Sequence, residues 1–135
     1  MSFTLPEYTI YHAAAADDVE AVAKLIRKGA DVNLPEHGST DNWFLLHWAA
    51  YNGNAALAQL LIRSGANVNV MCTAGNIGTP LHLAALWGKL SVAELLVKAG
   101  ADLTAKCNGS TPLQHANGMG QANVAEMLRK YGAKE

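Results

Sequence analysis

Residues 79–102 read TPLHLAALWGKLSVAELLVKAGAD, and the order of residue types in this stretch predicts two short helices joined by a turn. Thr79 can cap a helix with its side-chain oxygen, and Pro80 suits the first helical position, where a missing N–H costs nothing. Gly88 interrupts the chain after an alanine-rich helix. Apolar residues then recur at helical spacing until Gly100, which can adopt the left-handed conformation that ends a helix.

The same pattern recurs along the whole chain. The closing glycine stands at positions 29, 65, 100 and 132, at intervals of 36, 35 and 32 residues. A second motif, which reads TIYH, FLLH, TPLH and TPLQ, ends at positions 12, 47, 82 and 114, at intervals of 35, 35 and 32 residues. Two independent markers with a matching period predict four repeats of one helical unit.

These residues resemble the ankyrin-repeat family, through TPLHLAA at 79–85, Gly88 and LLVKAGAD at 95–102, and the likeness extends from about residue 8 to residue 133. The resemblance implies an all-α solenoid of stacked helix–turn–helix units, with β-hairpin-like fingers projecting at right angles. It implies one domain over residues 1–135, with repeats at about 8–40, 41–75, 76–108 and 109–133, of which the first and last act as caps. It also implies a protein that binds protein partners and catalyses nothing.

Two units depart from this pattern at the start or end of the first helix. Asp18 stands where units two to four have the turn glycine. Phe44 and Leu45 replace the capping threonine and the proline in unit two, so we expect Asp41 or Asn42 to cap that helix.

The fingers differ in length. From the closing glycine to the histidine position, the three connections span 18, 17 and 14 residues, so the first two are longer. Loops on a rigid scaffold often carry function. The extra residues include His37, Thr40, Asn42 and Trp43 in the first finger, and Met71, Thr73 and Asn76 in the second. Asn108 and Gly109 are expected to form the tight turn of the last finger.

Histidines and cysteines recur at repeat spacing. The resemblance implies that His12, His47 and His82 pack between helices and bond to the capping residue and nearby backbone. Repeats about 10 Å apart cannot bring all three to one zinc ion, so we expect no metal site. Cys72 and Cys107 have no second ligand nearby in sequence, and we expect free, partly exposed thiols.

Composition argues against several functional classes. With 10 basic and 11 acidic residues, the chain has no excess positive charge for nucleic acid or an acidic membrane. It has no apolar run of about 20 residues, no signal peptide and no disulfide framework, so we expect a cytoplasmic protein. No nucleophile elbow, phosphate loop or HExxH motif indicates an enzyme, a cofactor or a small-molecule substrate. We expect a monomer.

Aromatic residues give the candidate binding site. The resemblance implies that the two residues before each turn glycine face a concave groove, and these pairs are 16–17, 51–52, 86–87 and 118–119. Exposed aromatic and methionine side chains are typical of protein-binding hot spots. The predicted partner-binding residues are Tyr51, Leu86 and Trp87 as anchors, surrounded by Asn52, Trp43, Asn76 and Met119.

Two questions stay open around this site. Trp48 is expected in the core between repeats, whereas Trp43 and Phe44 could either pack against Trp48 or contact a partner. The first finger could also fold back over the aromatic residues.

The predicted function is that of a protein-interaction module. The alternative is an inhibitor or immunity-type protein that blocks the active site of a partner enzyme. An enzyme or a nucleic-acid binder is a remote alternative.

Overall fold

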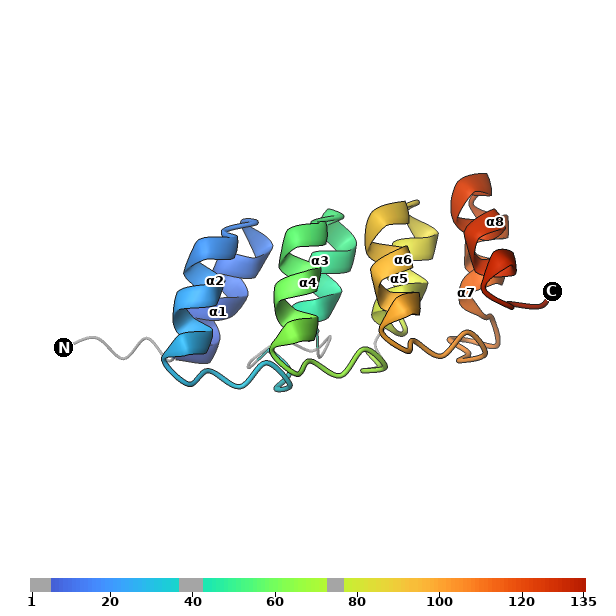
Figure 1. Ribbon diagram of the computed structural model, residues 1–135. Helices are drawn as coiled ribbons and strands as arrows, with labels where there is room; N and C mark the ends of the chain where they lie inside the picture. The colour runs from blue at the N-terminus through green and yellow to red at the C-terminus, as the bar shows by residue number, and fades with distance from the viewer. Residues whose placement is uncertain (1–5, 37–42, 73–76) are drawn as a thin grey trace.

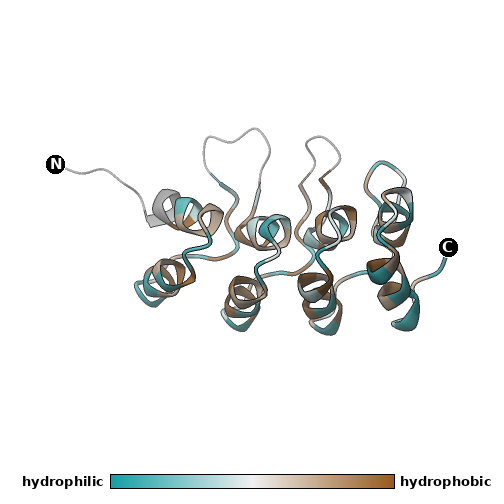
Figure 2. Cartoon of the chain, turned by 90° about the horizontal axis from the view of Figure 1, so that it is seen from above, coloured by the Kyte–Doolittle hydropathy of each residue, from teal (hydrophilic) through white to brown (hydrophobic). Residues whose placement is uncertain are grey.

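Four helical pairs stand side by side in a row, with the two termini at opposite ends (Figure 1). The computed structural model describes residues 6–36, 43–72 and 77–135, and side chains from residue 10 onward. The helices of this part of the chain are α1 (Pro6–Ala15), α2 (Val19–Arg27), α3 (Leu45–Asn52), α4 (Ala55–Arg63), α5 (Pro80–Leu86), α6 (Leu90–Lys98), α7 (Pro112–Gly118) and α8 (Ala122–Lys130). Odd-numbered helices form an inner row and even-numbered helices an outer row, and the fingers leave on the side of the inner row (Figure 2). The predicted all-α ankyrin-type solenoid is confirmed.

Helices α5 and α7 begin as the sequence predicts. The hydroxyl oxygen of Thr79 accepts the His82 N–H at 3.2 Å, and that of Thr111 accepts the Gln114 N–H at the same distance. Proline occupies the first helical position of both helices. The residue three positions after the cap bonds back to the cap residue. The Gln114 side-chain oxygen accepts the Thr111 N–H at 2.9 Å, and Nδ1 of His82 accepts the Thr79 N–H at 3.2 Å. This capping box satisfies two backbone donors that a helix start leaves open.

Helix α3 begins differently from the prediction. Its N-cap residue is Phe44, whose side chain makes no capping bond, and Leu45 is already helical. The Phe44 N–H donates to Nδ1 of His47 at 3.1 Å. Asp41 and Asn42, the predicted caps of this helix, lie outside the described residues. They precede the N-cap position by two residues or more, and the assignment of the cap to either of them is therefore wrong.

The first turn lies one residue earlier in the sequence than the spacing of the histidine motif suggests. Asp17, and not Asp18, takes the left-handed conformation, with a φ of 61°. Asp18 instead caps α2, because its carboxylate accepts the Ala21 N–H at 3.0 Å. Aspartate tolerates this backbone region better than most residues, and its neighbour supplies the cap that the following helix needs. The exposed pair of this unit accordingly shifts from 16–17 to 15–16.

This shift also changes which residue of unit one matches the histidines. Tyr11 lies six residues before the left-handed Asp17, as His47 lies six residues before Gly53. Tyr11 is buried, and its hydroxyl donates to the Leu34 carbonyl of the following finger. His12 is exposed, so the expectation that it packs between helices is wrong. The 35-residue spacing placed it one position out of register.

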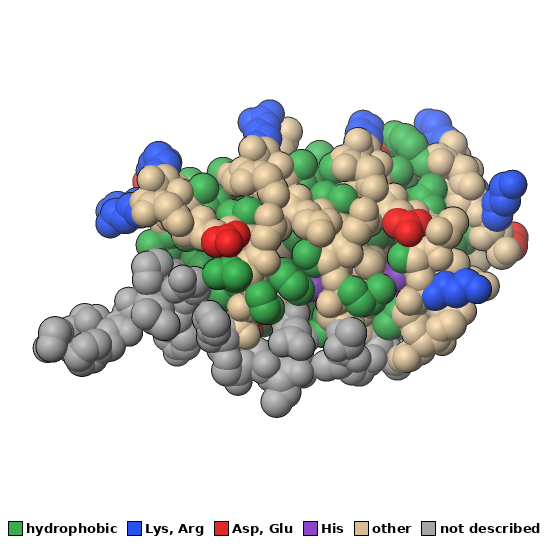
Figure 3. Space-filling view, turned by 90° about the horizontal axis from the view of Figure 1, so that it is seen from below, with side chains coloured by type: hydrophobic (Ala, Val, Ile, Leu, Met, Phe, Trp, Pro, Cys, Tyr) green, Lys and Arg blue, Asp and Glu red, His purple; other side chains and the backbone are tan. Residues whose placement is uncertain are grey.

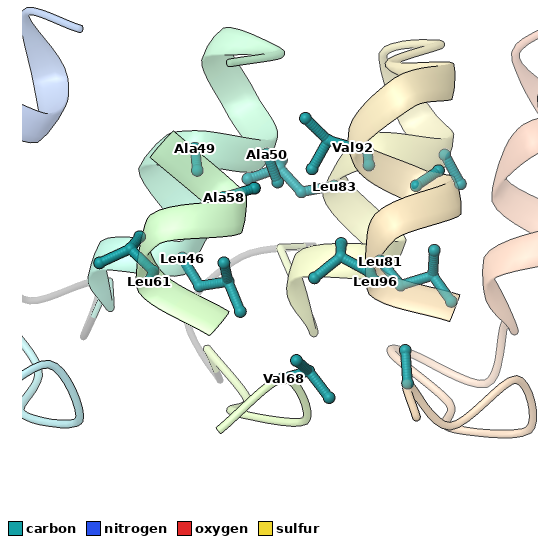
Figure 4. Close-up of a cluster of buried hydrophobic side chains, with 14 of the residues drawn as sticks. Leu46, Ala49, Ala50, Ala58, Leu61, Val68, Leu81, Leu83, Val92 and Leu96 are labelled. Atoms are coloured by element: carbon teal, nitrogen blue, oxygen red, sulfur yellow. The ribbon is translucent and has the colours of Figure 1, made fainter. Parts of the chain in front are cut away.

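The core runs through all four repeats as a continuous layer between neighbouring pairs. Figure 4 shows part of it, where side chains of α3 and α4 meet those of α5 and α6. Leu46, Leu61, Leu83 and Leu96 are each at most 1% exposed there. Alanines on the facing sides of the helices, which are also buried, permit this close approach. Each pair is too small to bury its own apolar face, and stacking does so instead.

Asparagine side chains tie successive repeats together near the closing glycines. Asn33 donates through Nδ2 to the Gly65 carbonyl at 3.0 Å, and its Oδ1 accepts the Asn67 N–H at 2.7 Å. Asn69 repeats this arrangement one unit later and accepts the Asp102 N–H at 2.8 Å. These bonds link the backbone of each unit to the next and fix their relative positions.

Short backbone bridges close the bases of two fingers. Cys72 pairs with Gly78, and Cys107 pairs with Ser110 across the tight turn at residues 108–109. Both turn residues have positive φ, which confirms the predicted turn. Neither cysteine forms a disulfide, and they are only 1% and 7% exposed, so the expectation of partly exposed thiols is wrong. A Cβ added to Gly78 would lie 2.8 Å from the Cβ of Cys107, so the bases of these two fingers approach closely at Gly78.

Candidate functional site

The end of the inner row away from the fingers presents large apolar side chains to solvent. Tyr51 lies in the last turn of α3, and Trp87 and Met119 are the C-cap residues of α5 and α7. They are 44%, 48% and 49% exposed, respectively. The left-handed glycine that follows within two residues ends each helix there. The structure thus places these three predicted residues at the same end of successive inner helices, with Trp87 and Met119 at equivalent positions and Tyr51 one position earlier in its repeat.

Aromatic rings extend this surface toward the first long finger. Tyr51 meets Trp87 edge to face, with ring centroids 6.2 Å apart and planes at 89°. On its other side Tyr51 contacts Trp43 at 5.8 Å, and Trp43 lies against Trp48 at 4.7 Å. Such arrangements are favoured by the charge distribution of aromatic rings. We call Trp43, Trp48, Tyr51 and Trp87 the aromatic cluster.

The structure answers the questions on Trp48 and Trp43. Trp48 is half-buried and packs against the core, but it is not fully enclosed. Trp43 is also half-buried, and it packs against Trp48, which is the first of its two alternatives. Phe44 is half-buried and lies against His47, with ring centroids 5.9 Å apart, and residues 37–42 of the first finger lie outside the described residues. The Trp48 Nε1–H is buried and finds no acceptor among the described residues.

Other predicted site residues are partly engaged within the protein. Asn52 donates through Nδ2 to the carbonyls of Ala14 and Ala15, at 3.3 and 3.2 Å, and to Oδ1 of Asp17 at 3.0 Å. Its amide donor therefore joins the first repeat to the second. Leu86 is half-buried beside Trp87. Asn76 lies outside the described residues.

A pocket opens beside the exposed rings, between the second and third repeats. It has a volume of about 320 Å³ and is lined by Tyr51, Asn52, Trp87 and Lys89. Lys89 is the N-cap residue of α6. Sequence reasoning missed it because it follows the turn glycine, and only the residues before that glycine were considered. The signal available was that the residue after the turn differs in every unit: Asp18, Asn54, Lys89 and Gln121.

The basic side chains gather elsewhere. Each outer helix carries lysine or arginine in its last turn, where these residues complement the negative end of the helix dipole. Figure 3 shows most of the Lys and Arg side chains along one edge of the molecule. Among the described residues lining the pocket at the aromatic cluster, Lys89 is the charged one. The cluster therefore lacks the row of cations that a nucleic-acid backbone requires.

The buried histidines are committed to structural hydrogen bonds. Nδ1 of His47 accepts a backbone N–H, so Nε2 carries the proton and donates to the Gly78 carbonyl at 2.8 Å. His82 bonds to Thr79 and to the Ser110 carbonyl, as the resemblance implied. Burial lowers the pKa of His47 to about 4 and lowers that of His82 as well, because a charged imidazole would lose its hydration.

Two classes of site are not found in the described residues. No group of three or more His, Cys, Asp or Glu side chains in that part of the chain could hold a metal ion. No described helix has the length and apolar character needed to cross a membrane.

Comparison with known proteins agrees with this architecture. A family model described as "Ankyrin repeats (3 copies)" matches residues 10–107 and 46–135. Human and mouse proteins named "Ankyrin repeat domain-containing protein 40" are each 33% identical over 69 residues, which is 51% of this chain and 18% of theirs. The chain thus spans under a fifth of the length of these relatives. Ankyrin repeats typically mediate protein–protein interactions and are generally non-catalytic. Through the match over most of its length, the chain belongs to the ankyrin-repeat family.

Proposed function

We propose that this protein binds a protein partner through the turn end of its inner helices. The contact surface consists of Tyr51, Trp87 and Met119, with Leu86 and the edges of Trp43 and Asn52 around them. Asn76 of the second finger belongs to the same proposal. Binding requires no chemical step from the protein and no cofactor.

One observation carries this proposal: three large apolar side chains, each 44–49% exposed, lie at the turn ends of the inner helices of three successive repeats. Monomeric proteins seldom expose such side chains together unless something binds there. Tyr51 and Trp87 hold one another edge to face, so their orientations are set before a partner arrives. A preformed surface loses less conformational entropy on binding, and a few aromatic residues can therefore supply most of the affinity.

The test is a pair of matched substitutions. Trp87→Ala removes the central ring, whereas Leu90→Ala removes an exposed apolar side chain, 38% exposed, from outer helix α6. Immobilised wild-type protein and both variants are used to capture partners from a cell lysate, and the affinity of each captured protein is then measured. We expect Trp87→Ala to weaken binding by about 2 kcal/mol or more, which is about 30-fold in Kd.

Leu90→Ala should bind as the wild type does. Both variants must show the wild-type helical circular dichroism, so that loss of binding reports the surface and not the fold. Partners retained by Trp87→Ala at undiminished affinity would exclude the turn end as the binding surface.

A further inference from the structure

The first residue after each turn reaches back to the preceding repeat. Asn54, Lys89 and Gln121 are the N-cap residues of α4, α6 and α8. Asn54 donates through Nδ2 to Oδ1 of Asp17 at 3.2 Å. Gln121 donates through Nε2 to the Leu86 carbonyl at 3.2 Å. At two of the three junctions, therefore, the polar head of this residue is bound within the stack.

Lys89 occupies the same position at the remaining junction and differs in its chemistry. Its side-chain stem crosses Gly53, where an added Cβ would lie 2.9 Å from Lys89 Cδ. The stem can lie there because Gly53 has no side chain, and this route brings Lys89 to the pocket with Tyr51 and Trp87. Among the described residues, one ion pair is formed, between Arg129 and Glu135. Lys89 is not part of an ion pair there.

The amide donor of Asn52, the other side-chain nitrogen donor from the polar residues of this pocket, is already occupied. The amide donor of Asn52 serves Ala14, Ala15 and Asp17 of the first repeat. The carboxylate of Asp17 is occupied as well, because it accepts hydrogen bonds from Asn52 and Asn54. Lys89 thus remains as the charged donor of a pocket whose walls are the rings of Tyr51 and Trp87.

We propose that the partner presents an acidic–apolar peptide segment to this pocket. An apolar side chain of the segment packs against the exposed parts of the Tyr51 and Trp87 rings, which touch one another edge to face, and an aspartate or glutamate a few residues away pairs with the Lys89 ammonium. This inference rests on the proposed function and adds the chemistry of the partner. Charge complementarity decides between ligand classes, because a cation that approached these two rings would meet Lys89, which has the same charge. A single lysine also gives no track for the repeated phosphates of a nucleic acid.

The test draws peptide ligands from a random library, so the natural partner need not be identified first. A library of 12-residue peptides displayed on phage is selected against wild-type protein and, in parallel, against Lys89→Glu. Wild-type protein should enrich peptides with Asp or Glu within a few residues of Leu, Phe or Trp. Lys89→Glu should enrich Arg or Lys at the same spacing, because the charge at the pocket is reversed. Enrichment that does not change between the two selections would overturn the inference.

Affinities of the enriched wild-type peptides then separate the inference from the proposed function. Lys89→Gln is the matched variant, since glutamine already fills the equivalent position at residue 121. It should weaken peptide binding about two- to fivefold at low salt and reduce the salt dependence, as expected for one exposed ion pair. Trp87→Ala should weaken it more than tenfold. A loss with Trp87→Ala but none with Lys89→Gln overturns the inference alone, and no loss with Trp87→Ala overturns the proposed function.

A fluorescent 12-nucleotide single-stranded DNA, dT12, provides the competing ligand class. Fluorescence anisotropy should show no binding that depends on Trp87 at physiological salt. Micromolar binding of dT12 that is lost in both Trp87→Ala and Lys89→Gln would overturn the peptide inference in favour of a stacked nucleic acid.

Discussion

The two ends of the inner helices differ sharply in what surrounds them. Within α3, His47 near the finger end is fully buried and bonded on both ring nitrogens, whereas Tyr51, one turn later, is 44% exposed. Helix α5 repeats the contrast between His82 and Trp87. The finger end therefore carries fully buried side chains, whereas the turn end combines hydrogen bonds between repeats, such as those of Asn52 and Gln121, with large apolar side chains that stay exposed. Stability and recognition can vary separately along one short helix.

The strongest test of this separation removes apolar packing at the finger end. Leu46→Ala deletes a side chain that is 1% exposed and lies beside His47 between repeats. We expect the free energy of unfolding to fall by about 3 kcal/mol, because a cavity remains where the repeats meet. Urea unfolding followed by circular dichroism measures the change. A loss below about 1 kcal/mol would mean that the finger end does not carry the stack.

Acid should weaken the same end through its buried imidazoles. The pKa of His47 drops from 6.5 to about 4 on folding, so between these pH values the unfolded chain binds more protons than the native one. The free energy of unfolding therefore falls as pH falls through this window, by about 3 kcal/mol for His47 alone. The stabilisation is fully present above pH 6.5. Urea unfolding at several pH values between 7 and 4 checks it.

His47→Gln is the control for this pH dependence. Gln114 holds the equivalent position in the fourth repeat, where its side-chain oxygen accepts the Thr111 N–H as the His47 ring accepts that of Phe44. The variant should therefore fold, and its stability should vary less with pH than that of the wild type. An unchanged pH slope would show that His47 does not control the acid sensitivity.

Much of the finger end could be predicted from sequence, because its signals are local. Thr79, Pro80 and His82 specify a helix start by their chemistry and order alone. The first repeat was harder to predict, since Asp17 and Asp18 can each take a turn or cap role, and the two markers disagree: counting from the histidine position gives Asp18 as the turn residue, whereas counting 12 residues back from Gly29 gives Asp17. The left-handed φ of Asp17 and the hydrogen bond from the Ala21 N–H to Asp18 show that the second count is right.

The turn end could be predicted only in part. The exposure of Tyr51 and Trp87 follows from their position before a turn glycine. The presence of Lys89 depends on a contact between repeats, in which its stem lies over Gly53, 36 residues earlier in sequence. Repeat periodicity aligns equivalent positions, but it does not show which side chain crosses to a neighbour.

Tyr11→Phe tests whether unit one uses a tyrosine in place of the histidine. The substitution keeps the buried ring and removes the hydroxyl that bonds to the Leu34 carbonyl. We expect a loss of about 1 kcal/mol in the free energy of unfolding, the usual contribution of one hydrogen bond of this kind. His12→Ala, at an exposed neighbour, should change stability less. A larger effect from His12→Ala would restore the register that the 35-residue period suggests.

The smallest effect is expected at the turn end. Met119 is 49% exposed at the C-cap of α7, and its removal in Met119→Ala leaves no cavity in the core. We expect the free energy of unfolding to change by less than about 0.5 kcal/mol, as is usual for exposed positions without special contacts. The same urea titration used for Leu46→Ala measures it. A loss comparable to that of Leu46→Ala would mean that the exposed row stabilises the stack, and its apolar character would then need no partner to explain it.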